Sequence, residues 1–111
     1  MSVESKNLTG VGIVVRNQQE VKEYIKNHLS TLNAAEQEAL DEADVEDFLK
    51  LRRENLEIEC LNAFYGEWFF FGFKLCSHNP EEFAQQTLKA AQDWRAMFGE
   101  AGKMITEVVI Y

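Results

Sequence analysis

The stretch at residues 67–76, EWFFFGFKLC, is the sequence feature that most constrains the fold. Apolar side chains occupy nearly every position and do not alternate with polar ones. Because successive side chains of a strand point to opposite faces of a sheet, this pattern is typical of a central strand that is buried on both faces. The run is far shorter than the roughly 20 apolar residues of a membrane-spanning helix. The rest of the chain must therefore cover both faces of this strand.

Helix starts are marked at three places by an asparagine with a glutamate three residues later. The pairs are Asn17 with Glu20, Asn33 with Glu36, and Asn79 with Glu82. Such a capping box satisfies backbone amides that the first helical turn leaves unpaired. Apolar spacing then predicts helices at 18–31 and 80–98, the second with Pro80 at its first position and Gly99 just after its end. Its predicted buried stripe contains Phe83, Thr87, Leu88, Ala91, Trp94 and Phe98.

Residues 34–55 form a further helical segment that is rich in acid. Asp44 marks another helix start within it, so the segment is either one bent helix or two short ones. An apolar stripe is predicted to hold the segment onto the fold, and it contains Leu40, Ala43, Phe48 and Leu51. Val45, Leu49 and Leu56 lie on a neighbouring stripe. The acids occupy the remaining face.

Strands are predicted at 9–16, 56–66, 67–76 and 103–111 from β-branched or alternating apolar residues. The region 56–66 also fits a helical continuation, although a strand is favoured because YGEW at 65–68 then supplies a hairpin turn. Without the acidic segment, the order is βαββαβ. This is the pattern of a ferredoxin-like α+β fold, with four antiparallel strands and two helices on one face. We expect a single domain over residues 1–111.

The net charge of −8 limits the classes of partner. Ten acids and only three bases lie in residues 34–60, so the excess is concentrated in the acidic segment. Binding of nucleic acid or of an anionic membrane needs clustered lysine and arginine, and an acidic surface instead favours basic partners. The first residues are polar, unlike a signal peptide, and the two cysteines do not make a disulfide framework. We therefore expect a cytoplasmic protein that contacts neither nucleic acid nor membrane directly.

No motif in the sequence identifies a catalytic or metal site. Cys76 and His78 supply two metal ligands of the four that a structural zinc site uses, and Cys60 could add only a third. A Cys76–His78 nucleophile pair is less favoured than a buried thiol beside a turn histidine, and His28 is expected to be a boundary residue with its ring half buried. The glycines of 10–12 lack the lysine and helix start of a phosphate loop. We expect no cofactor, and enzymatic activity is left open.

The acidic segment is the best indication of function. We expect a small protein–protein interaction module, such as an inhibitor, an immunity protein or an anti-defence protein, that docks a basic partner. That partner would itself bind nucleic acid, as a nuclease does, because its positive groove would attract carboxylates. The candidate contact residues are Glu38, Asp41, Glu42, Asp44, Glu46 and Asp47. The alternative is a ferredoxin-like homodimer that binds a small ligand, or acts as an enzyme, in an apolar pocket on the open sheet face.

Overall fold

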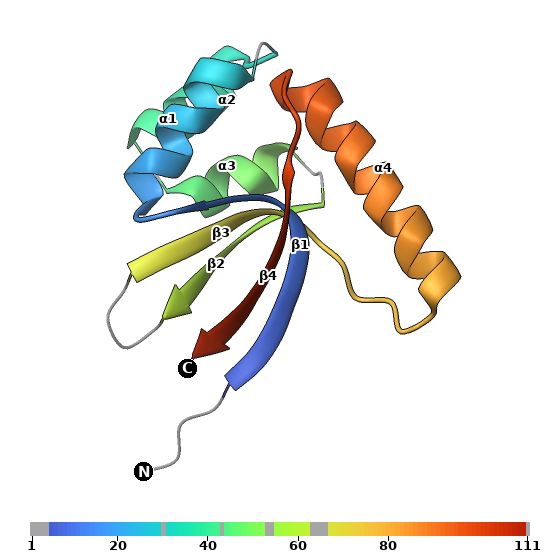
Figure 1. Cartoon of the computed structure of the whole chain (residues 1–111). Helices are drawn as coiled ribbons and strands as arrows, with labels where there is room; N and C mark the ends of the chain where they lie inside the picture. Colours follow the sequence, from blue (N-terminus) through green and yellow to red (C-terminus); the bar gives the residue numbers. More distant parts are fainter. Residues whose placement is uncertain (1–4, 30, 43, 53–54, 63–66, 111) are drawn as a thin grey trace.

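A computed structural model of the chain describes residues 5–29, 31–42, 44–52, 55–62 and 67–110. Four strands and four helices follow one another along these residues (Figure 1). They are β1 (Ser5–Val15), α1 (Gln18–His28), α2 (Ala34–Glu42), α3 (Val45–Arg52), β2 (Leu56–Asn62), β3 (Glu67–Lys74), α4 (Pro80–Phe98) and β4 (Lys103–Ile110). The acidic segment is thus two short helices, and the region after it is a strand. Ala43 and the first two residues of the predicted hairpin turn at 65–68 lie outside the described residues, and the other two belong to β3.

The strands form one curled sheet in the order β2-β3-β1-β4. All three of these neighbouring pairs are antiparallel. A single parallel bridge between Asn62 and Ile110 also joins β2 to β4, so the two edges meet. The predicted α+β class with a four-stranded antiparallel sheet is confirmed. The specific ferredoxin-like topology stays a prediction.

Glycines allow the two central strands to approach closely. Gly12 of β1 lies opposite Gly72 of β3. A Cβ atom on Gly12 would lie 2.1 Å from the carbonyl oxygen of Phe71, and one on Gly72 would lie 2.2 Å from that of Val11. The glycines at 10–12 therefore serve strand packing, because only residues without a side chain fit this crossing.

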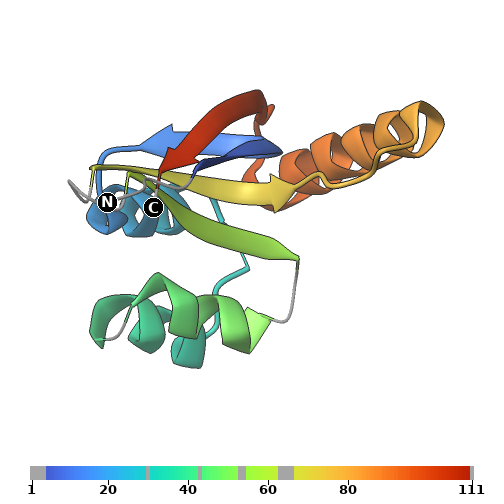
Figure 2. The ribbon, with the colours of Figure 1, turned by 90° about the horizontal axis from the view of Figure 1, so that it is seen from below.

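The larger core lies between the sheet and the helices. Phe71 projects from β3 into a cluster of fully buried side chains that includes Ile25 of α1, Phe48 of α3 and Trp94 of α4. Rings of Phe71, Trp94 and Phe98 contact one another at tilted and edge-on angles. All four helices therefore lie on the convex face of the sheet, and Figure 2 shows α2 and α3 as a pair apart from α4.

The concave face of the sheet has a core of its own. Phe70 is fully buried there, and Ile105 and Val109 of β4 pack around it together with Leu8 and Leu61. A second subunit on this open face was the alternative arrangement that the sequence allowed. Instead, the curled sheet covers it with its own strands, and residues 34–55 lie on the other side. The face thus needs no partner to keep Phe70, Ile105 and Val109 out of water.

Two predicted core positions are wrong. Leu88 of α4 is 60% exposed, and Ala90 is buried in its place. Leu51 of α3 is 53% exposed, and Val45 takes its place beside Phe48. In both helices the apolar spacing was compatible with two faces, and the position of the sheet selects between them. None of the described helices is long and apolar enough to span a membrane.

Candidate interaction surface

The six predicted contact residues occupy α2, α3 and the turn between them. They form what we call the acidic surface: Glu38, Asp41, Glu42, Asp44, Glu46 and Asp47. All six side chains are exposed. The apolar residues of the same helices point the other way, since Leu40, Val45 and Phe48 are completely or almost completely buried. The two-sided pattern that the sequence predicted is thus present, with the carboxylates turned to solvent.

A polar contact on the inner side of the pair fixes α2 against α3. Glu36 is buried, and one of its carboxylate oxygens accepts hydrogen bonds from the Arg52 guanidinium at 3.1 Å. The other oxygen accepts from the backbone amide of Asn33, whose side chain accepts from the amide of Glu36 in return. Arg52 also donates to the Thr31 hydroxyl. The sequence identified Glu36 only as part of a capping box, and nothing in its spacing pointed to Arg52.

The carboxylates of the acidic surface differ in their partners. Asp41 forms an ion pair with Lys26 of α1 and accepts a hydrogen bond from Gln37. The hydrogen bond from Lys26 is the main reason why the pKa of Asp41 is lowered. Asp44 caps α3 by accepting from the backbone amide of Asp47 at 3.0 Å. Asp41 and Asp44 therefore already form contacts that stabilise the fold of this chain.

Four acids of the acidic surface lack a partner among the residues that the structure describes. The carboxylates of Glu38, Glu42, Glu46 and Asp47 make no hydrogen bond or ion pair within the described part of the chain. Glu46 and Lys50, four residues apart on α3, do not pair with each other. Like charges held close together on one surface raise the electrostatic energy of the free protein, and a cationic partner would lower it.

The histidines and cysteines take structural or solvent-exposed positions. His28 stacks on Tyr24 with 4.2 Å between ring centroids, and its Nε2 lies 3.6 Å from the Glu100 carboxylate. Cys76 is exposed and Cys60 half-buried, and both are free thiols. Among the described residues, no three histidine, cysteine or acidic side chains come together as metal ligands.

Tyr24 lies at the centre of the contact between α1 and the end of α4. Its hydroxyl donates to the Glu100 carboxylate, and its ring contacts Trp94 and Phe98. Burial, followed by the hydrogen bond and negative charge of Glu100, raises the pKa of Tyr24 well above its ordinary value. Tyr24 therefore stays protonated at neutral pH and acts as a hydrogen-bond donor that joins α1 to the residues after α4.

No protein-family model, curated protein or solved structure matches this chain. Function must therefore be inferred from the geometry and charge of the surface itself.

Proposed function

We propose that this protein is an interaction module that binds a basic protein through the acidic surface of α2 and α3. The observation that carries the proposal is the orientation of this helix pair. Its apolar residues and the Glu36–Arg52 pair anchor it, while its carboxylates face solvent. A preformed charged surface loses little entropy on binding and steers an oppositely charged partner during encounter.

The chemistry of the partner follows from the surface. It would present clustered lysine and arginine side chains, as the nucleic-acid groove of a nuclease does. The module would then act as an inhibitor or immunity-type protein by occupying that groove. A cytoplasmic location is part of the proposal, and the free thiols of Cys60 and Cys76 are compatible with a reducing compartment.

We also propose that the scaffold is a curled variant of the ferredoxin-like fold. Two features support this. The connection from β1 to β2 and the connection from β3 to β4 each pass through helices and skip one strand of the sheet. In this scheme α2 and α3 are an insertion between the first helix and the second strand, which is where the acid is concentrated.

The test uses a pair of charge reversals that leaves the structural acids intact. Glu42→Lys and Glu46→Lys are both exposed changes without intramolecular partners among the described residues. Each adds two positive charges, so the net charge moves from −8 to −4. The matched control carries Glu23→Lys and Glu81→Lys, which change the net charge equally at exposed positions outside α2 and α3.

Tagged parent, surface variant and control are incubated with native lysate at low salt, and the captured proteins are identified and then purified. We expect a basic protein that binds the parent and the control with similar association rates. The surface variant should bind it at least about tenfold more slowly, and salt should weaken parent binding. The proposal fails if the folded surface variant and the control lose the captured partner equally, or if neither loses it.

A further inference from the structure

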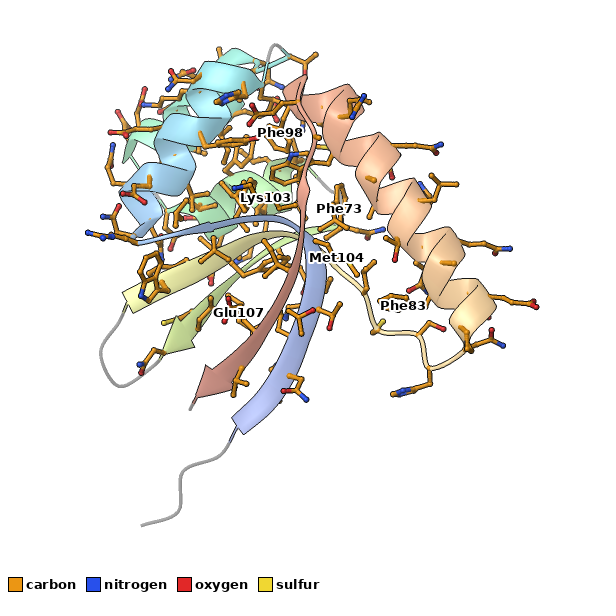
Figure 3. All side chains as sticks on the ribbon, in the orientation of Figure 1. Phe73, Phe83, Phe98, Lys103, Met104 and Glu107 are labelled. Carbon is orange, nitrogen blue, oxygen red and sulfur yellow. The ribbon has the colours of Figure 1, made fainter. Side chains whose placement is uncertain are left out.

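A second feature of the molecule lies on the concave side of the sheet, away from the acidic surface. Where β2 and β4 diverge from their bridge at Asn62 and Ile110, the sheet leaves a cavity of about 370 Å³. This volume lies within the range of small-molecule sites, and the mouths of curled sheets are frequent places for them. Its lining residues are Val14, Leu61, Asn62, Trp68, Glu107 and Val108. Figure 3 labels Glu107 where it projects from β4.

Trp68 at this cavity has an unusual backbone. Its φ angle is 62°, and it is the one non-glycine residue with positive φ among those that the structure describes. Bulky side chains rarely adopt this conformation, and strained residues of this kind occur preferentially at binding sites. The indole is 44% exposed although it belongs to a strand of the core sheet. The Arg16 guanidinium lies over the ring, 5.4 Å from its centroid.

Two acceptor groups among the lining residues have no donor within the described part of the chain. Oδ1 of Asn62 is buried and has no hydrogen-bond partner among the described residues. Such an atom is normally satisfied by a partner or by water. The carboxylate of Glu107 makes no hydrogen bond or ion pair with a described residue. None of the lining residues carries a positive charge.

A larger hollow between α4 and the strands β2 and β3 has no such unpaired acceptors among its described charged side chains. Its volume is about 580 Å³, but its charged side chains already pair with one another or with neighbours. Lys89 pairs with Asp93, and Lys74 pairs with Glu57 and Glu59. The charged side chains of that hollow therefore have partners already, and none of them indicates a ligand.

We propose that the cavity beside Trp68 binds a small amphipathic amine. Its ammonium group donates hydrogen bonds to the carboxylate of Glu107 and to Oδ1 of Asn62. Its apolar body, aromatic or branched aliphatic, packs on the indole of Trp68 and on the aliphatic side chains of the cavity. This function is independent of the acidic surface, which lies on the other side of the sheet.

The test measures binding of phenethylamine and of phenethyl alcohol, which share the apolar body but differ in charge and in donors. Affinities come from calorimetry, and the site is located by the NMR shift of the Trp68 indole N–H. We expect the amine to bind at least about tenfold more tightly than the alcohol. In Glu107→Gln the affinity for the amine should fall about tenfold, while the affinity for the alcohol should change little. Glu81→Gln, an exposed carboxylate elsewhere, serves as the control and should bind the amine as the parent does.

Three outcomes would overturn the proposal. The first is equal affinity for amine and alcohol. The second is amine binding that Glu107→Gln and Glu81→Gln affect to the same extent. The third is an unchanged Trp68 indole signal at millimolar amine. Because Glu107 is exposed, Glu107→Gln should fold normally, and circular dichroism of each variant checks this.

Discussion

The guanidinium of Arg52 lies 3.1 Å from the carboxylate of Glu36 and joins the last turn of α3 to the first turn of α2. Both side chains are almost fully shielded from solvent. Arg52→Ala leaves a buried carboxylate without its cation, so the free energy of unfolding should fall by about 2–4 kcal/mol. Urea unfolding measures this. Lys50→Ala, an exposed change two residues before Arg52 on the same helix, should alter stability by less than about 0.5 kcal/mol. Equal effects of the two changes would show that the pair does not anchor the acidic surface.

The close approach of the paired strands β1 and β3 at Gly12 should not tolerate a methyl group. Gly12→Ala would place Cβ 2.1 Å from the Phe71 carbonyl oxygen, which is backbone and cannot move aside without separating the strands. We expect a loss of about 3 kcal/mol or more in thermal or urea unfolding. Gly99→Ala is the comparison, because its Cβ would meet nothing within 4 Å and only its φ of 75° is unfavourable. That change should cost about 1 kcal/mol. A Gly12→Ala protein as stable as Gly99→Ala would contradict the strand register.

The phase of α4 can be tested with two large apolar residues of the same helix. Trp94 is fully buried among aromatic rings, so Trp94→Ala should destabilise by about 3–5 kcal/mol. Leu88 is largely exposed, and Leu88→Ala should change stability by less than about 0.5 kcal/mol. Chemical denaturation of both variants decides the matter. A large loss at Leu88 would mean that the helix is rotated about its axis relative to this structure.

Glu59 should make stability depend on pH. Burial alone would raise the pKa of its carboxyl, but hydrogen bonds and charge from Lys74 and Lys6 outweigh burial and lower the pKa. A lowered pKa in the folded state means that the stabilisation is present above the ordinary value of 4.5 and is lost as the pH falls below it. Glu59→Gln should therefore be about 1–3 kcal/mol less stable than the parent at neutral pH.

This difference should shrink as the pH falls below 4.5 and through the lowered pKa of Glu59, where the parent carboxyl becomes protonated. Urea unfolding at neutral pH and at the lowest pH that leaves both proteins folded measures it. Glu57→Gln is the control, since this carboxylate contacts the same Lys74 from an exposed position at 3.8 Å and should matter little at either pH. A difference between Glu59→Gln and parent that stays constant with pH would exclude an ionised Glu59 as the source of stability.

The starts of three helices followed from the sequence because they depend on contacts within one turn. Asn17, Asn33 and Asn79 each accept a hydrogen bond from a backbone amide two or three residues later. The glutamates of the three capping boxes accept hydrogen bonds from different donors. The Glu36 carboxylate accepts from the backbone amide of Asn33, as a capping box requires. The Glu20 carboxylate instead accepts from the backbone amide of Arg16, and the Glu82 carboxylate accepts from the Ser77 hydroxyl. Several donors near each helix start can reach these carboxylates, and the spacing of the sequence does not predict which donor forms the hydrogen bond.

The alternation of apolar residues predicted the four strands, and helical spacing predicted the exposed carboxylates of the acidic surface. Its limit is visible at Leu51 and Leu88, where spacing allowed two helix faces and the sheet buried the other one. Tertiary structure alone decided the curl of the sheet that buries Phe70 and the pairing of Glu36 with Arg52. Both depend on contacts between residues far apart in the chain. Local periodicity fixes which way a side chain points from its own element, and the packing of elements fixes what that side chain meets.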